Sequence, residues 1–365
     1  MQLSEFDYDL PPELIAQRPL PDRDASRLLV VDRAAGSFAE HAFRELPQIL
    51  RAGDLLVLNN TRVFPARLLG HRQGVTAQAI GKHNPARREY LRAEIEILLL
   101  RREDDEVWQA LVHPGRKVRT GEVISFGHGE LEAEVISRGE RGLRRLRLRA
   151  PTGRDTVDEA IDRLGHVPLP PYIRRPDNHL DRDAYQTIYA KVPGAAAAPT
   201  AGLHFTAAVF EQLRASGVET CEVTLHVGLG TFRPVQAERV EDHRTEAEPF
   251  EISEAAAAAI NRARREGRRI VAVGTTSVRT LEQVARSRHA GGTIPVGRGD
   301  ADLFIVPGFQ FQVTGGLLTN FHLPRSTLLM LVEAFGGRDL IRHAYRYAIE
   351  QRYRFYSYGD CMLIV

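Results

Sequence analysis

Lysine and cysteine are both scarce in this 365-residue chain. Only three of its 49 basic residues are lysines, and its two cysteines, Cys221 and Cys361, lie in separate hydrophobic runs. No CxxC pair is present, so the usual cysteine spacings of a zinc site or a redox dithiol are absent. We expect both thiols to be reduced and buried, as in a protein of a reducing compartment. The arginine excess has two explanations, codon bias of the genome or selection for guanidinium groups that bind phosphate.

Long apolar runs and net charge are also lacking. The apolar stretch at 328–332 is far too short to cross a bilayer. The first residues, MQLSEFDYDLPPEL, are acidic and contain no apolar signal core, so we expect a cytoplasmic protein. The formal net charge of +2 excludes a molecule that attracts nucleic acid over its whole surface. Only a local basic patch could bind RNA.

The length and the residue pattern predict two domains of different type. Residues 27–31 and 55–58 are strand-like, whereas residues 69–150 contain short apolar runs separated by glycine turns, a pattern typical of an antiparallel barrel or sandwich. These runs are 94–100, 107–112, 123–126, 131–136 and 143–148. The glycine-containing stretch 70–91 predicts a surface loop inserted into this region.

From about residue 151 strands and helices alternate. Helices are predicted after the capping residues Thr206, Ser253, Ser277 and Ser326, and strands at 222–227, 269–273, 316–318 and 362–365. A further helix is expected at 339–350. We therefore predict an α/β fold in which residues 1–68 and 151–365 form a main domain with a mixed sheet. A small antiparallel β-barrel domain, residues 69–150, interrupts it.

Several predicted strands end in short polar loops. The loops are rich in Thr, Asn, His and Gly, and they occupy residues 59–62, 199–204, 226–233, 274–277 and 319–322. Such loops expose backbone N–H groups and hydroxyls close to helix N-termini, which suits a carboxylate or phosphate. Five in one chain indicate a shared polar cleft at the carboxyl ends of the strands.

Three histidines, His204, His226 and His322, lie in these loops. An imidazole titrates near pH 7 and can transfer protons, although a lone histidine is more often a hydrogen-bonded structural group. The spacings HxH and HExxH are absent, and so are a P-loop and a complete dinucleotide fingerprint, because Gly228 and Gly230 have no third glycine. Metal ligation by the histidines stays open as a competing interpretation.

Two arginine stripes are candidates for RNA binding. One lies on a single strand face in residues 143–149, and the other repeats every fourth residue in the last helix. The stripes consist of Arg145, Arg147 and Arg149, and of Arg338, Arg342 and Arg346. Each stripe could bind successive phosphates of an RNA backbone, or could simply be a solvated face.

At these loops the sequence resembles the S-adenosylmethionine:tRNA ribosyltransferase-isomerase family of queuosine biosynthesis. The matching segments run in order from residue 6 to residue 360. They are FDYDLP at 6–11, DASRL at 24–28, GDLLVLNNTRV at 53–63, GHVPLPPY at 165–172, APTAGLHFT at 198–206, TLHVGLGTFRP at 224–234, VGTTSVRTL at 273–281, LTNFHLP at 318–324, STLLM at 326–330 and SYGD at 357–360.

The resemblance implies a reaction as well as a fold. The family transfers the ribosyl part of S-adenosylmethionine to 7-aminomethyl-7-deazaguanine at the wobble position of a tRNA with a GUN anticodon. The ribosyl group becomes an epoxycyclopentane, and adenine and methionine leave. S-adenosylmethionine is consumed, so no other cofactor or metal is expected, and neither is a membrane partner. We expect a monomer with the α/β-plus-barrel layout derived above.

The sequence departs from the family at two places. The family commonly has a His-Lys-Met-His-Ser-Glu run where this chain has HRTEAE at 243–248, so Glu246 replaces a histidine. The stretch 70–91 is longer than usual and is interpreted as a peripheral insertion.

The matched loops give a set of expected site residues. We expect His204, His226 and His322 to transfer protons, Arg233 or Arg279 to bind the methionine carboxylate through a bidentate fork, and Glu282 or Asp360 to face the ammonium or sulfonium. An alternative for Arg279 and Glu282 is a helical i,i+3 ion pair. The remaining substrate-binding candidates are Asn59, Asn60, Thr61, Arg62, Thr200, Gly202, Gly228, Gly230, Thr231, Thr275, Thr276 and Asn320.

Two other classes of function remain as alternatives. A metal-dependent hydrolase would use the strand-end histidines as ligands and would contain stoichiometric metal. A non-catalytic RNA-binding module would need the arginine stripes but no polar cleft, and it would release no adenine.

Overall fold

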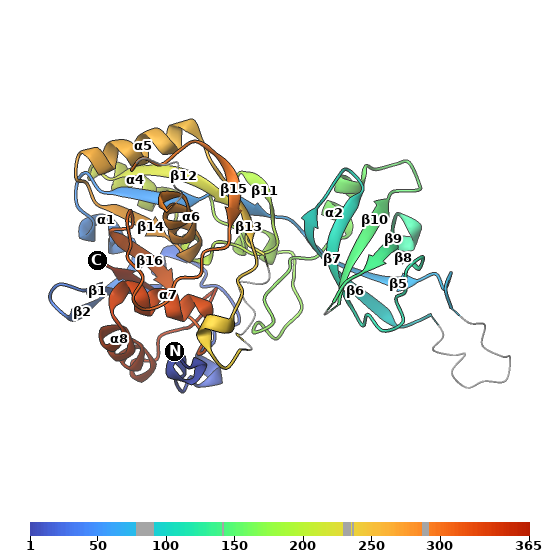
Figure 1. Cartoon of the computed structure of the whole chain (residues 1–365), viewed down its shortest axis with the longest axis horizontal. Coiled ribbons are helices and arrows are strands. Elements are labelled where there is room, and N and C mark those ends of the chain that lie inside the picture. Colours follow the sequence, from blue (N-terminus) through green and yellow to red (C-terminus); the bar gives the residue numbers. More distant parts are fainter. Residues whose placement is uncertain (78–90, 141, 229–234, 236, 287–291) are drawn as a thin grey trace.

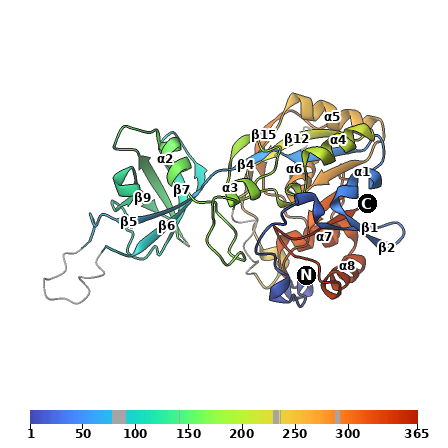
Figure 2. The same cartoon turned by 180° about the vertical axis from the view of Figure 1, so that it is seen from behind.

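The computed structural model describes residues 1–77, 91–140, 142–228, 235, 237–286 and 292–365. Figure 1 shows two bodies side by side, a larger one with a layered sheet and a smaller barrel, and both termini lie in the larger body. Figure 2 shows from behind that only a few segments near β4 (Thr61–Val63) and α3 (Asp181–Ala184) join them. The predicted combination of an α/β unit with a closed antiparallel barrel is confirmed.

The larger body is built on a nine-stranded mixed sheet. Its strand order is β15-β13-β12-β3-β14-β16-β17-β1-β2. Strands β12, β3, β14 and β16 run parallel to one another, whereas β16 pairs antiparallel with β17. In sheet order the bounds are Gly297–Ala301, Glu248–Ile252, Glu219–Leu225, Leu55–Asn59, Ile270–Val273, Gly316–Asn320, Cys361–Ile364, Arg27–Asp32 and Ser37–Ala42.

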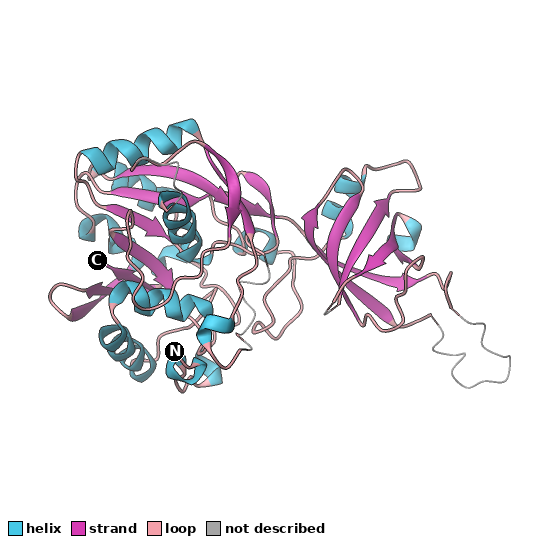
Figure 3. Cartoon of the chain, viewed as in Figure 1, coloured by secondary structure: helices cyan, strands magenta, loops and turns pink. Residues whose placement is uncertain are grey.

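Helices cover both faces of this sheet (Figure 3). Alternate residues of a strand point to opposite faces. Leu55 and Val57 of β3 therefore pack in the core of α5 to α8, whereas Leu56 and Leu58 pack in the core of α1 and α4. The helices are α1 (Leu46–Ile49), α4 (Ala207–Ala215), α5 (Glu254–Arg265), α6 (Thr275–Ala285), α7 (Thr327–Gly336) and α8 (Arg338–Glu350).

The predicted caps and cysteines are largely confirmed. Thr206, Ser253 and Ser326 each accept a hydrogen bond from the third residue of the helix that follows. Helix α6 instead begins two residues before Ser277, with Gly274 at its N-cap in a left-handed conformation (φ 86°) that glycine tolerates. Both cysteines are buried free thiols. In the part of the chain that the structure describes, no helix has the length and apolar content of a membrane span.

The smaller body is a closed barrel of order β10-β7-β6-β5-β8-β9. Its strands are β5 (Arg67–Arg72), β6 (Glu94–Arg102), β7 (Val107–His113), β8 (Val123–Phe126), β9 (Leu131–Arg138) and β10 (Leu143–Arg149). The loop expected at 70–91 is wrong at its start, because β5 continues to Arg72. Gly70 is needed inside this strand, since a Cβ there would lie 2.5 Å from the Phe126 ring. Residues 78–90 of that stretch lie outside the described residues.

The proposed domain boundaries at 68/69 and 150/151 stay predictions. Helix α2 (Val157–Leu164) packs Ala160 and Ile161 into the barrel core. This contact favours a barrel unit that extends beyond residue 150.

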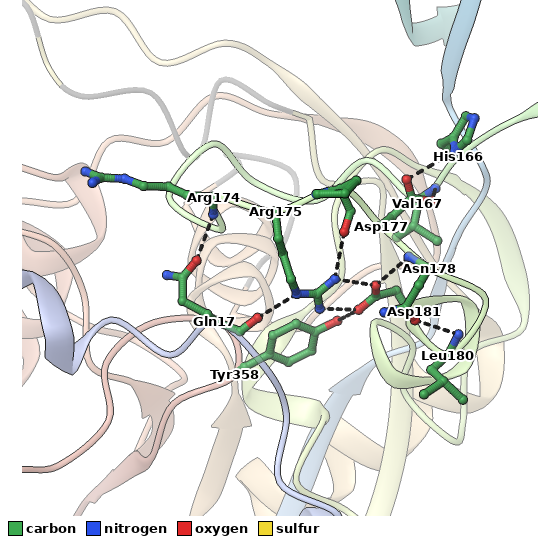
Figure 4. A network of polar contacts seen from close by, with 11 residues as sticks. Gln17, His166, Val167, Arg174, Arg175, Asp177, Asn178, Leu180, Asp181 and Tyr358 are labelled. Atoms are coloured by element: carbon green, nitrogen blue, oxygen red, sulfur yellow. Dashed lines mark hydrogen bonds and ion pairs between the residues drawn. The ribbon is translucent and has the colours of Figure 1, made fainter.

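The chain returns from the barrel through a segment held by a buried ion pair (Figure 4). The Arg175 guanidinium donates two hydrogen bonds of 2.7 Å to the Asp181 carboxylate, and the Tyr358 hydroxyl donates a third at 2.9 Å. Burial by itself raises the pKa of Asp181, but the hydrogen bonds from Arg175, the Asn178 N–H and Tyr358, together with the charge of Arg175, outweigh it and the pKa is lowered. The network ties the returning segment to the loop that precedes β17.

Candidate active site

The polar loops predicted from the sequence meet at one edge of the main sheet. Strands β12, β3, β14 and β16 are parallel, so their carboxyl ends lie at the same edge. β17 is antiparallel to β16 and parallel to β1, so residues 26 and 360 reach the same edge from the opposite direction. The loop residues gathered there include Asn59, His226, Thr275, Asn320 and His322.

Asn59 joins two of these strands and is fully buried. Its amide donates to the Leu225 carbonyl at 2.9 Å and to the Thr276 hydroxyl at 3.3 Å. Its carbonyl accepts from the N–H groups of Thr61 and Leu225 at 3.2 and 3.0 Å. Asn59 thus fixes the relative position of β3, β12 and the first turn of α6.

The neighbouring Asn60 points elsewhere. Its side chain bonds to Glu222 at 3.1 Å and to the Thr224 hydroxyl at 2.7 Å, and it lines a separate cavity of about 450 Å³. Arg62 is exposed on β4. The structure therefore does not bring the side chains of these two candidates to the group of strand-end loop residues around Asn59 and Thr276.

His204 is buried within a hydrogen-bond chain. Its Nδ1 lies 2.7 Å from the Ser26 hydroxyl, and its Nε2 lies 3.2 Å from the Asn320 amide nitrogen. The Asn320 carbonyl accepts from the Thr200 hydroxyl at 2.9 Å, so the amide donates to Nε2 and the proton of the ring is on Nδ1. Burial lowers the pKa of His204 to about 4. The ring is neutral at pH 7 and orients Asn320.

His322 lines a small cavity of about 30 Å³ at the same edge. Its Nε2 lies 2.7 Å from the Thr319 hydroxyl, and burial lowers its pKa to about 3. Thr200, Thr275, Thr276 and Asn320 line the same cavity. Sequence analysis missed two further lining residues, Tyr356 and Ser357, although Ser357 begins the matched segment SYGD.

His226 faces a much larger cavity, of about 820 Å³, between the barrel and the main sheet. Its Nδ1 lies 2.8 Å from the Thr61 hydroxyl, and the ring is half-buried, which lowers its pKa. The ring packs over Gly194, where a Cβ would lie 2.8 Å from it. Barrel residues such as Trp108 and main-sheet residues such as Gly228 line this cavity.

Arg279, Glu282 and Asp360 all have partners within the protein. The buried Arg279 pairs with Glu248, and its guanidinium also donates to the Ala301 carbonyl at 2.7 Å. Glu282 accepts from the backbone N–H groups of residues 312–314 at 2.8–3.1 Å. Arg279 and Glu282 thus bind partners outside helix α6. The alternative considered from the sequence was an ion pair between these two residues within the helix.

Glu248 was also missed by sequence analysis. Its second oxygen accepts from the Gly228 N–H at 2.8 Å, so the Arg279–Glu248 pair holds the start of the loop after His226. Asp360 accepts from the backbone N–H groups of Arg27 and Arg354 at 2.9 and 2.8 Å, and burial raises its pKa.

The remaining candidates are placed as follows. At Gly202 a Cβ would lie 2.0 Å from the Tyr189 hydroxyl, so only glycine fits. Gly230, Thr231 and Arg233 lie outside the described residues. Across the described ranges, no three His, Cys, Asp or Glu side chains gather as a metal site would require.

Both arginine stripes carry acidic partners. Arg145 pairs with Glu103 at 2.7 Å, and Arg147 with Glu134 at 3.4 Å. In α8, Arg338 pairs with Glu5 at 2.9 Å and Arg342 with Glu333 at 3.3 Å, whereas Arg149 and Arg346 are exposed. RNA binding by the stripes stays a prediction, with part of their charge compensated.

Comparison with known proteins covers nearly the whole chain. The family described as queuosine biosynthesis protein matches residues 3–364. Proteins named S-adenosylmethionine:tRNA ribosyltransferase-isomerase from Solibacter usitatus and Symbiobacterium thermophilum are 56% and 51% identical, each over 100% of both chains. The crystal structure of S-adenosylmethionine tRNA ribosyltransferase from Thermotoga maritima is 38% identical, with a TM-score of 0.54, over 99% of this chain and 100% of that one. The chain therefore belongs to the queuosine biosynthesis protein family.

Proposed function

We propose that this protein is an S-adenosylmethionine:tRNA ribosyltransferase-isomerase. It transfers and rearranges the ribosyl group of S-adenosylmethionine onto 7-aminomethyl-7-deazaguanine at the wobble position of a tRNA with a GUN anticodon. Epoxyqueuosine is formed, and adenine and methionine leave. The observation that carries the proposal is the full-length identity of 47–56% to seven proteins named for this activity. The enzyme acts as a cytoplasmic monomer and needs no cofactor beyond the consumed donor.

The proposed binding site for the methionine end of the donor is the sheet-edge cleft, the small cavity of about 30 Å³ beside His322. The rest of the donor extends into the adjoining cavity of about 820 Å³, since Val227 lines both. Thr275 and Thr276 lie in the first turn of α6, whose free N–H groups favour an anionic group such as the methionine carboxylate. The hydroxyl of Thr200 and the amide of Asn320 add polar groups to the lining of the same cavity. Arg233 remains the arginine candidate for the carboxylate, because Arg279 is engaged by Glu248.

The three histidines receive different roles in this proposal. His226 transfers a proton, since its half-buried ring lines the large cavity, where a tRNA base has room. His322 lines the small cavity and acts there as a neutral hydrogen-bonding group at pH 7. His204 positions Asn320 through its Nε2. Neutral imidazoles suit a donor that carries a positive sulfonium, because they add no repulsive charge.

Glu282 and Asp360 support the site from behind. Glu282 binds three consecutive backbone N–H groups, and Asp360 binds two, so each carboxylate holds a loop in place. We assign them to positioning rather than to contact with the sulfonium.

The test is a product analysis. The protein is incubated with S-adenosylmethionine and tRNA that carries the aminomethyl base, and adenine, methionine and nucleoside mass are followed. We expect one adenine and one methionine per modified tRNA. Accumulation of S-adenosylhomocysteine would mean methyl transfer and would refute the proposal.

A further inference from the structure

A third cavity, of about 550 Å³, lies on the barrel and is not used by the proposed chemistry. It is bounded by β6, β7, β10 and the end of β9, and by the turn that follows β7. Its polar lining is mainly basic, and the residues concerned are His113, Arg116, Arg138 and Arg144.

Arg144 is the unusual member of this group, because its side chain is 97% buried without a carboxylate partner among the described residues. Its Nη atoms donate to the carbonyls of Leu143 and Gly115 at 2.7 and 3.1 Å, and its buried Nε has no hydrogen-bond partner. Burial, together with repulsion from Arg138, lowers its pKa. A buried charge is costly unless it is paired, so this guanidinium lacks an anion.

The rest of the lining does not supply that anion. Arg116 and Arg138 are exposed at the cavity and have no ion pair within the described part of the chain. Glu96, the acidic residue in the described lining, is 2.9 Å from Arg67 and is compensated by it. Three guanidinium groups therefore converge on a space with little negative charge.

We propose that this cavity binds a backbone phosphate of the tRNA substrate, with Arg116 and Arg138 as direct ligands and Arg144 as the buried charge beneath them. Guanidinium groups match phosphate oxygens in geometry and charge. Leu111 of β7 lines both this cavity and the 820 Å³ cavity beside His226, so the two are adjacent. A nucleotide in the larger cavity can thus place a neighbouring phosphate here. This inference rests on the proposed function, in which tRNA is the substrate.

The experiment measures tRNA binding over a range of salt concentrations. Arg116→Gln/Arg138→Gln is compared with Arg92→Gln/Arg119→Gln, a pair of exposed barrel arginines that do not line the cavity. We expect the first pair to weaken Kd for tRNA about tenfold or more, as for lost charged hydrogen bonds. The slope of log Kd against log salt should fall by about one unit, for one phosphate. The control pair should change Kd for tRNA and the salt slope less than the first pair does. KM for S-adenosylmethionine should stay the same in both.

Three further results separate the explanations. Arg144→Met removes the buried charge, so it should weaken tRNA binding while the thermal midpoint confirms folding, and Arg144→Lys, which keeps the charge, should recover part of the affinity. Wild-type affinity in a folded Arg144→Met variant would contradict the proposal. Unchanged Kd and unchanged salt slope in Arg116→Gln/Arg138→Gln would overturn the phosphate site, even where the wild-type enzyme releases adenine.

A second measurement tests free phosphate as the ligand. If inorganic phosphate raises the thermal midpoint of the wild type but not of that variant, and tRNA affinity is unchanged, the cavity binds free phosphate and the tRNA assignment is wrong. Absence of adenine release from wild type would instead refute the proposed function.

Discussion

At the residue scale, the three histidines differ in how closely their rings are held. His204 has both ring nitrogens engaged, by Ser26 and by Asn320, and His322 is bonded to Thr319. His226 is half-buried beside the large cavity. Their positions in strand-end loops made all three histidines candidates for proton transfer. The hydrogen bonds and the burial of each ring are seen only in the structure.

Removal of the imidazoles should reduce kcat strongly and change the thermal midpoint little. We expect His226→Ala to lower kcat by about 10²-fold or more, the scale of lost acid–base assistance. His204→Ala should have a similar effect by releasing Asn320, and His204→Gln, which keeps a hydrogen-bonding side chain, should recover part of it. Steady-state kinetics and thermal midpoints check both. Near wild-type turnover in either alanine variant would make that histidine purely structural.

The buried histidines also predict how stability depends on pH. The folded-state pKa of His204 is about 4, below the unfolded value of about 6.5, so between these values the unfolded chain binds the extra proton. Stability is therefore present above about pH 6.5 and is lost as the pH falls toward 4, by roughly 3 kcal/mol from this group. Urea unfolding at several pH values should show a flatter dependence for His204→Gln. The exposed His128→Gln is the control, and an equal change in both would contradict this origin.

At the element scale, the sequence predicts most of the sheet and its helices, and it fails where packing overrides local pattern. The predicted loop 70–91 took in the last three residues of β5, because the glycines and proline further along that stretch are typical of a loop, whereas Gly70 lies in the strand and is required by the ring of Phe126. The strand predicted at 222–227 lies too far along the chain at both ends, because β12 begins at Glu219 and ends at Leu225, before His226. Caps followed by clear apolar periodicity, such as Thr206 and Ser253, were predicted correctly.

The site was predictable in its loops but not in its long-range partners. Thr200, Thr275 and Asn320 gather because they end neighbouring parallel strands or lie beside them, which a strand-and-loop pattern reveals. The pairing of Arg279 with Glu248 joins residues 31 positions apart on different elements. No helical spacing predicts such a pair, so the sequence offered Arg279 only as one of two candidates for the methionine carboxylate or as the partner of Glu282 in a helical pair.

The segment returning from the barrel should depend on its buried ion pair. We expect Asp181→Ala to destabilise the protein by about 3–5 kcal/mol, because it leaves the Arg175 charge buried without a partner. The double variant Arg175→Met/Asp181→Leu should recover a large part of this loss. Chemical denaturation measures both. A loss below about 1 kcal/mol for Asp181→Ala would show that the pair behaves like an exposed one.

At the scale of the whole molecule, tRNA must be held by local surfaces, since the net charge is only +2. The two predicted stripes lie on different bodies, β10 on the barrel and α8 beside the main sheet (Figure 1). Acidic neighbours compensate four of their six arginines, and Arg149 and Arg346 are the exposed remainder.

Arg149→Gln and Arg346→Gln test these stripes. A true contact should raise KM for tRNA and flatten the salt dependence by about one unit per lost phosphate. KM for S-adenosylmethionine should not change, because the proposed donor site lies at the edge of the main sheet, away from both residues. Unchanged tRNA affinity and salt slope in both variants would identify the stripes as solvated faces.

The position of β17 has a consequence for synthesis of the protein. This strand, residues 361–364, lies in the interior of the nine-stranded sheet, between β16 and β1. A nascent chain that has not yet reached residue 361 therefore exposes the edges of both neighbours, whereas every strand of the barrel is available once residue 149 has emerged. The barrel can fold on the ribosome, but the main sheet must wait for its last strand, and in that interval its open edges are the part of the molecule most exposed to aggregation and to chaperones.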